Sequence, residues 1–315
     1  MDLERIQKIN ILILKPISRL LKANVATFNK EGEVIEPFYF GNEVCRMIKS
    51  HKVGESICQD SHKMVLNSVK LKNNMVKKGI IEKRPPKITN FEDEQEDIIV
   101  DYCNAGLLKV LYPIKNDEGE IVGYTGICGC FKEGYEKYSL KKLSTISKIL
   151  GFDEEEFLNL AKSEIKSLSE KDIKAILELV KNMIKHNIDL KELYTCLSKE
   201  ELGEEDEECI LKFIECFIHP MGEFIGSNLV IFDDRFNALF VMDYDGFSFI
   251  MEHVGSNKDK IKKLKEPLFL KQERIFIIPM YELYLIGTIN ENCKYTTEEI
   301  KEFVYVIYQY YKSIL

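Results

Sequence analysis

A glycine stands at every third position of the segment EIVGYTGICGCF, residues 120–131, which otherwise consists mainly of apolar and β-branched residues. The turn residues NDEG precede it, so the segment predicts the returning strand of a hairpin. Glycines inside a strand give up side-chain packing, and they are expected where a helix or a ligand comes close to the backbone. The segment therefore predicts a strand whose backbone is closely approached, either by a helix or by a ligand.

The segments at the start of the chain alternate between helical and extended patterns. Residues 2–21 have apolar side chains at helical spacing, with Pro16 as the expected kink or end of the helix. Residues 24–37 predict a hairpin. Two further helices are expected at residues 40–50 and from about residue 56 to 78.

Two more strands are expected before the glycine-rich segment. They are DIIVDYC and AGLLKVLYPI, and Pro113 is expected to end the second or to place it at a sheet edge. Residues 83–97, which are charged and contain two prolines, predict a surface loop or flap. The order of elements predicts an α+β fold in which helices cover an antiparallel sheet.

The rest of the chain predicts helices, a linker and a second sheet. Amphipathic helices able to carry a signal or to dimerise are expected between residues 153 and 191, followed by an acidic linker at residues 198–208. A helix with Cys209 and Cys216 comes next, and residues 296–315 predict a closing helix with a Thr cap. Between them, antiparallel strands are expected in NLVIFDD, NALFVMDYDG, FSFIMEHV, RIFIIPMYE and LYLIGTINE, with DDRFN and DYDG as turns.

Length and composition limit the class of protein. The 315 residues suffice for two domains, because a single hydrophobic core rarely grows beyond roughly 250 to 300 residues. A net charge of −8 argues against direct binding to nucleic acid, which depends on Lys and Arg. The apolar run at residues 11–14 is too short for an export signal or a membrane span. We therefore expect a cytoplasmic protein with no membrane contact.

Five of the nine cysteines gather between residues 45 and 130, and in a reducing compartment they are expected as thiols, ligands or redox groups. Cys45 and Cys58 are expected at the starts of successive helices, where the helix dipole lowers a thiol pKa. With Cys103 and one of Cys128 or Cys130, they come from four elements able to converge on one face of the sheet. Four thiolates suit an iron–sulfur cluster or zinc, whereas neutral thiols suit the wall of an apolar pocket. No close CxxC pair is present, so both alternatives stay open.

Two histidines, His51 and His62, flank Cys58 in the sequence. His51 and His62 are able to add metal ligands or to hydrogen-bond a ligand hydroxyl, but their helical context favours exposed positions on the helix surface. We expect them to be exposed.

The segments EVCRMIKS, GESICQDSHK and YCNAGLLKVLYPI, with the glycine-rich return strand, resemble the PocR sensory domain, a PAS-like ligand-binding module of bacterial and archaeal regulators. The helical segment after the sheet extends the resemblance to about residues 1–190. It implies sensing of a small organic molecule, proposed for the family to be a hydrocarbon derivative such as a diol. The candidate ligand-binding residues are Cys45, Cys58, Asp60, Cys103, Gly106, Leu107, Gly126 and Cys128.

The resemblance for the first part of the chain, the acidic linker, and the order of elements after it together predict an organisation. We expect a sensory domain at residues 1–150, a helical signalling linker at 151–206, and a GAF- or PAS-like second domain at 207–315. The long acidic loop and Cys130, which stands where the family often has Gln, depart from the family pattern. No helix-turn-helix, kinase or cyclase signature follows, so the output partner stays open.

No sequence pattern of a common catalytic site is present, so the chain is not expected to be an enzyme. The leading hypothesis is a signalling sensor that binds an effector in the first domain and passes the change to the second domain or a partner, as a homodimer or with a signalling protein in transcription regulation. An iron–sulfur- or metal-binding redox sensor using Cys45, Cys58, Cys103 and Cys128 or Cys130 is the alternative. A third hypothesis is an interaction protein whose second domain dimerises or docks a partner.

Overall fold

The structure is a computed structural model that describes residues 2–77, 98–186, 218–270, 274–280, 283–291 and 293–314. The expected loop at 83–97, the acidic linker at 198–208, and Cys209 and Cys216 lie outside the described residues. The chain divides into two compact units, Met1–Lys181 and Asn182–Leu315. Each unit has its own sheet with helices packed against it, so the expected α+β class with two such modules is confirmed.

In the first unit the strand order is β2-β1-β5-β4-β3, and the short strand β6 pairs with β5 in parallel. The other pairs are antiparallel. The strands are β1 (Asn24–Asn29), β2 (Val34–Tyr39), β3 (Ile99–Tyr102), β4 (Leu108–Lys115), β5 (Ile121–Lys132) and β6 (Ser167–Leu168). The glycine-rich segment is thus β5, at the centre of the sheet, and both predicted hairpins, β1–β2 and β4–β5, are present.

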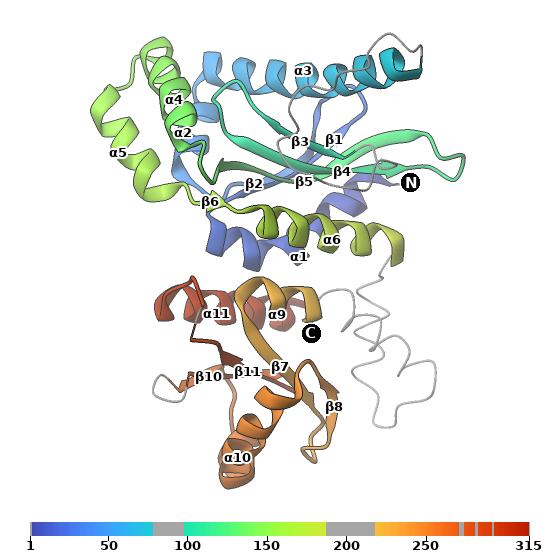
Figure 1. The fold of residues 1–315 in the computed structure, drawn as a ribbon, viewed down its shortest axis with the longest axis vertical. Coiled ribbons are helices and arrows are strands. Elements are labelled where there is room, and N and C mark those ends of the chain that lie inside the picture. Colours follow the sequence, from blue (N-terminus) through green and yellow to red (C-terminus); the bar gives the residue numbers. More distant parts are fainter. Residues whose placement is uncertain are drawn as a thin grey trace. The chain divides into compact units, whose positions relative to one another are not determined.

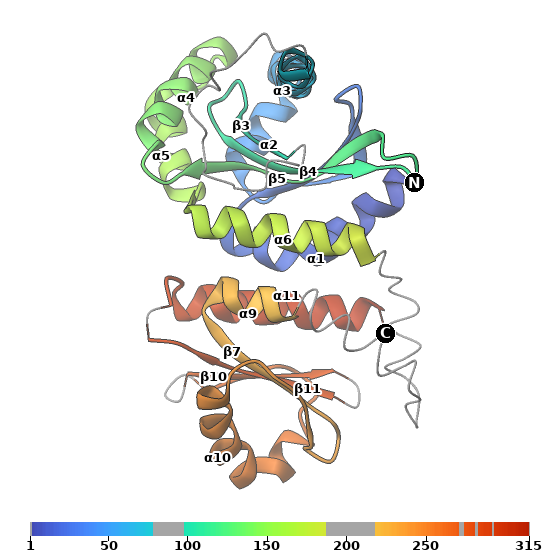
Figure 2. The same ribbon diagram turned by 45° about the vertical axis from the view of Figure 1, so that its right-hand side comes forward.

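Helices cover both faces of this sheet. α1 and α6 lie side by side on one face, α2 and α3 cover the other, and α4 and α5 lie beyond one end (Figure 1 and Figure 2). The helices are α1 (Leu3–Leu21), α2 (Glu43–Ser50), α3 (Lys52–Lys77), α4 (Glu136–Leu150), α5 (Glu154–Glu164) and α6 (Glu170–His186). α1 continues past Pro16, so the proline does not end the helix.

Pro113 does not end β4, which runs on to Lys115, so that part of the expectation is wrong. β4 is an interior strand between β5 and β3, but its pairing with β3 extends only from Leu108 to Leu111. At Pro113 the strand pairs with Tyr124 of β5 on one side. On the other side no described strand pairs with Pro113, and a residue without a backbone N–H is tolerated at such a position.

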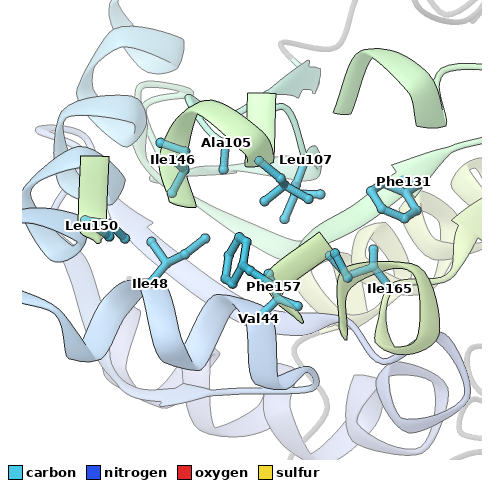
Figure 3. Close-up of a cluster of buried hydrophobic side chains, with 11 residues drawn as sticks. Val44, Ile48, Ala105, Leu107, Phe131, Ile146, Leu150, Phe157 and Ile165 are labelled. Atoms are coloured by element: carbon cyan, nitrogen blue, oxygen red, sulfur yellow. The ribbon is translucent and has the colours of Figure 1, made fainter. Parts of the chain in front are cut away.

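One hydrophobic cluster of the first unit joins α2, α4, α5 and the loop before β4 (Figure 3). Val44 and Ile48 come from α2, and Phe157, only 2% exposed, comes from α5. The other buried members are Ala105, Leu107, Phe131, Leu143, Ile146, Leu150, Ala161 and Ile165. The first of the helices expected to carry a signal therefore shares a core with α2.

The second unit contains a five-stranded antiparallel sheet of order β8-β7-β11-β10-β9. Its strands are β7 (Ser227–Phe232), β8 (Ala238–Val241), β9 (Leu268–Leu270), β10 (Ile275–Met280) and β11 (Leu283–Ile289), and its helices are α9 (His219–Ile225), α10 (Tyr244–Ile261) and α11 (Thr297–Ile314). α10 lies on one face of the sheet, and α9 and α11 lie on the other (Figure 2). The closing helix is confirmed, and Thr296 caps it through reciprocal hydrogen bonds with Glu299.

The prediction of a strand at FSFIMEHV is wrong, because this segment lies inside α10. The apolar side chains that pack from this segment into the core recur at helical spacing and are Phe247, Ile250, Met251 and Val254. Asp243, expected in a turn, is the N-cap of α10, and its carboxylate accepts a hydrogen bond from the N–H of Gly246 at 3.3 Å. The likeness of this unit to GAF or PAS modules stays a prediction.

Candidate functional site

Three neighbouring strands of the first unit place a row of polar side chains on one face of the sheet. Cys128 of β5 pairs with Asn24 of β1 on one side and with Lys109 of β4 on the other. Directly paired residues project to the same face. The amine of Lys109 donates to the hydroxyl of Ser61 in α3 at 3.3 Å, so this row faces α2 and α3.

Four thiols from four elements meet over this row. Cys45 comes from α2, Cys58 from α3, Cys103 from the turn after β3 and Cys128 from β5. Burial raises the pKa of the Cys45 thiol well above its ordinary value, and the nearby Cys128, Cys58 and Cys103 raise it further. The four side chains are therefore close enough to interact electrostatically.

The expected lowering of the Cys45 and Cys58 pKa values by helix N-termini is wrong. α3 begins at Lys52, so Cys58 lies in its second turn and not at its start. Burial raises the pKa of Cys58 to about 12, with smaller increases from Cys103 and Cys128. The pKa of Cys128 is raised for the same main reason, since burial disfavours the thiolate. These thiols are neutral near pH 7.

Cys130 lies on the opposite face of the sheet from Cys128. β5 has a bulge at this point, because Lys109 pairs with Cys128 whereas the preceding residue Leu108 pairs with Cys130. The extra residue, Gly129, shifts the alternation of side chains by one position. Burial raises the pKa of Cys130, with further contributions from Cys128 and from Asp172 of α6, the helix on that opposite face.

Cys45, Cys58, Cys103 and Cys128 form what we call the thiol region. Gly129 allows this region to pack closely against β5. Its φ of +87° is in the left-handed region, and a Cβ there would lie 2.4 Å from Nδ2 of Asn24 and 3.0 Å from Sγ of Cys45. The side-chain amide of Asn42, the N-cap of α2, donates to the carbonyl of Gly129 at 3.1 Å. The glycine therefore lets α2 and its Cys45 approach the strand.

Other candidate residues have structural positions. Gly106 has a φ of +76° and packs against Lys142 of α4, and its carbonyl accepts from the hydroxyl of Ser139 at 2.6 Å. Leu107 is buried in the hydrophobic cluster, although its N–H donates to Sγ of Cys103 at 3.4 Å. Gly126 lies against the backbone of β4, where a Cβ would meet a carbonyl at 2.2 Å. Asp60 is exposed on α3.

Sequence reasoning missed Ser61 and Lys109, and it placed His62 wrongly. His62, expected to be exposed, is only 6% exposed, and its ring lies 4.3 Å from that of Phe28. Burial lowers the pKa of His62 to about 2, and Lys109 and Lys49 lower it further, so the imidazole is neutral. The spacing of Cys58, Ser61, His62, Val65 and Leu66 on α3 follows one helical face, a pattern that predicts their common burial.

Neighbouring thiols do not by themselves make a metal site. Among the described residues, no group of three or more His, Cys, Asp or Glu side chains is arranged to hold a metal ion. Helices long and apolar enough to cross a membrane are likewise absent from the described ranges.

The second unit contains a separate cavity of about 150 Å³ between α10 and the sheet. Val254 and Ile261 of α10 line it from one side, and Ile277 and Ile286 line it from the strands. It is distinct from the thiol region of the first unit.

The first unit thus defines an α+β module with polar groups and thiols gathered between a sheet and its covering helices. Residues 83–192 match the family model described as the sensory domain found in PocR. The chain therefore carries a PocR-like sensory domain across that range, which confirms the resemblance there; the match includes Lys109 and Cys128 but not α2 or α3. No curated protein and no solved structure matches the chain.

Proposed function

We propose that the protein is a regulatory sensor that binds a small organic effector between the sheet of the first unit and helices α2 and α3. The observation that carries this proposal is Nδ1 of His62, a buried atom with no hydrogen-bond partner among the described residues. An unpaired buried polar atom costs on the order of 1–3 kcal/mol, and in native proteins it points to a missing partner. An effector with a hydroxyl group supplies that partner for either tautomer of the ring.

The surroundings of His62 suit a compound with both apolar and polar parts. The neutral thiols of Cys45, Cys58 and Cys128 present small, weakly polar surfaces that pack against carbon. The hydroxyl of Ser61 and the amine of Lys109 lie beside them. A short hydrocarbon derivative that carries oxygen atoms, such as a diol, fits this combination, as the family resemblance implies.

The signal is proposed to leave the site through α2. Cys45 lies on this helix between Val44 and Ile48, which pack against Phe157 of α5 (Figure 3). A shift of α2 on effector binding changes the packing of α5, and α6 follows α5 in the chain. The receiver is proposed to be the second unit, a second copy of the chain or a signalling protein in transcription regulation.

Effector binding is tested on the full-length protein by thermal shift, followed by calorimetry, against short diols, aldehydes and carboxylic acids. We expect a saturable hit whose affinity falls on the order of tenfold in His62→Phe. The matched control is His51→Phe, because His51 lies outside the thiol region at the end of α2. The absence of any saturable hit, or an equal loss in both variants, contradicts the proposal.

The relay is tested by hydrogen exchange with and without the hit compound. Binding is expected to slow exchange in α2 and α3, and also in α5, which the proposed site does not include. Protection confined to α2 and α3 would leave binding intact but contradict the relay.

A metal-binding redox sensor is the alternative function, supported by the four interacting thiols but not by their arrangement among the described residues. Protein purified without oxygen is then expected to contain iron or zinc in elemental analysis. The metal should be lost in Cys45→Ser, Cys58→Ser and Cys103→Ser. A stoichiometric metal of this kind would overturn the effector proposal.

A further inference from the structure

Lys109 places a charged amine inside the first unit. The residue is 2% exposed, its Nζ donates to Ser61 at 3.3 Å, and the ring centroid of Phe28 lies 6.0 Å away. No carboxylate forms an ion pair with this amine in the part of the chain that the structure describes. A buried charge without a partner is strongly unfavourable, so such groups in folded proteins are normally paired.

The neighbouring strand offers one carboxylate, but it forms no ion pair with the amine. Asp101 of β3 pairs with Lys109 in the sheet register. Its Oδ1 accepts a hydrogen bond from the N–H of Tyr102 at 2.8 Å, and no ion pair joins Asp101 to Lys109. The carboxylate of Asp101 is therefore on the residue paired with Lys109, but it does not form an ion pair with the Lys109 amine.

Among the residues that the structure describes, the other groups that face Lys109 do not supply negative charge. α3 presents the neutral imidazole of His62 and the neutral thiol of Cys58, and β5 presents the neutral thiol of Cys128. α2 adds a second cation, Lys49, whose Nζ lies 3.8 Å from the ring centroid of Phe38 and which also lowers the pKa of His62. β1 contributes the uncharged Asn24. The described side chains around His62 therefore include two cations, Lys109 and Lys49.

We propose that the effector of this site is a small organic carboxylate, with Lys109 as the buried counterion for its carboxylate group. This inference rests on the proposed effector-binding function and narrows its ligand class from oxygen-bearing hydrocarbon derivatives in general to those with a carboxylate group. Hydrogen bonds between an ammonium and a carboxylate are shorter and stronger than those between neutral groups. The hydroxyl of Ser61, already in contact with the amine, lies where it is able to assist.

The ligand test compares matched compounds that differ in charge but not in size. Calorimetry on the full-length protein, in a buffer without organic anions, uses propionate with propionamide, lactate with lactamide, and benzoate with benzamide, and adds 1,2-propanediol as a neutral probe. At least one carboxylate is expected to bind on the order of 10- to 100-fold more tightly than its amide. Lys109→Met should remove this preference, whereas Asp101→Asn should keep it.

A second measurement does not depend on the choice of compound. Because Met has nearly the volume of Lys and no charge, Lys109→Met is expected to stabilise the first unit. In the ligand-free full-length protein, the Tm of the transition that unfolds this unit should rise by a few degrees, on the order of 3 °C. A fall in Tm would mean that the amine is already paired, and it overturns the inference.

The outcomes separate this inference from the proposed function. Binding of 1,2-propanediol or of an amide as tightly as the carboxylates overturns the anionic class but leaves the effector site in place. Binding of none of the seven compounds overturns the carboxylate assignment whatever the Tm change, and the wider screen for any saturable hit then decides the function.

Discussion

The Sγ atom of Cys45 lies 3.0 Å from the position that a Cβ on Gly129 would occupy, so helix α2 rests directly on the backbone of β5. This contact joins the first turn of α2 to the bulge of the central strand. It explains why the sequence has a glycine at this position, where both the backbone conformation and the neighbouring side chains exclude a larger residue.

Gly129→Ala is therefore expected to lower the free energy of unfolding by about 2–4 kcal/mol, since it adds a steric clash to a left-handed backbone conformation. The matched control is Gly119→Ala, because Gly119 has a similar φ of +79° but no heavy atom within 4 Å of an added Cβ. The control should cost only about 1 kcal/mol. Urea unfolding measures both, and equal losses would show that the contact with α2 has no energetic weight.

Acid should destabilise the first unit through His62. Its pKa in the folded state is about 2, against an ordinary value of 6.5, so below pH 6.5 the unfolded chain binds a proton that the folded chain does not. The free energy of unfolding should therefore fall as pH decreases from 6.5 towards 2, by at most about 1.4 kcal/mol per pH unit for one proton. Urea unfolding between pH 7 and pH 4 is expected to give a shallower slope in His62→Gln than in wild type. Unchanged slopes would contradict the buried, neutral imidazole.

Alkali should destabilise the same unit through Cys58. Its pKa rises from an ordinary 9.0 to about 12 on folding, so above pH 9.0 the unfolded chain loses a proton that the folded chain retains. Stability from this thiol is complete below pH 9.0 and is lost progressively as pH rises towards 12. Unfolding measured from pH 8 to pH 11 should show a smaller loss in Cys58→Ala than in wild type. Cys293→Ala, a change at a half-buried thiol of the second unit, serves as the control.

The cavity of the second unit leads to a prediction about stability. Val254→Ile adds one methyl group towards this space of about 150 Å³ and should stabilise the unit by up to about 0.8 kcal/mol. Val230→Ile is the matched control, since Val230 is fully buried in the same hydrophobic cluster but does not line the cavity. Overpacking there should cost about 1–3 kcal/mol. A loss of stability in Val254→Ile, measured by thermal unfolding, would mean that the cavity cannot accept the added group.

The sheet of the first unit could be predicted because its signals are local. Strand alternation and the turn residues at 29–33 and 116–119 define the hairpins, and the side-chain oxygens of Asn29 and Asn116 accept the backbone hydrogen bonds that fix those turns. The helix at FSFIMEHV was missed because a short apolar run suits either a strand or a helix. Tertiary packing determines that this run, which follows one strand of the sheet and precedes another in the chain, folds as a helix.

The contents of the site depended on contacts between distant parts of the chain. Cys45, Cys58, Cys103 and Cys128 were expected together because they come from four elements of one small domain. The bulge that separates Cys130 from them is visible only in the pairing of β4 with β5. The burial of Lys109 could not be predicted, because a lysine in an alternating strand normally faces water.

The hydroxyl of Ser61 accepts hydrogen bonds from two donors, the amine of Lys109 and the backbone N–H of Asn104 at 3.0 Å. A hydroxyl oxygen has two lone pairs, so both are in use and only its proton remains to be given away. The Ser61 hydroxyl is therefore able to donate a hydrogen bond to an oxygen atom of a ligand, but it is not able to accept one from a ligand ammonium or amide group. At this point the protein selects ligand groups by their hydrogen-bond polarity.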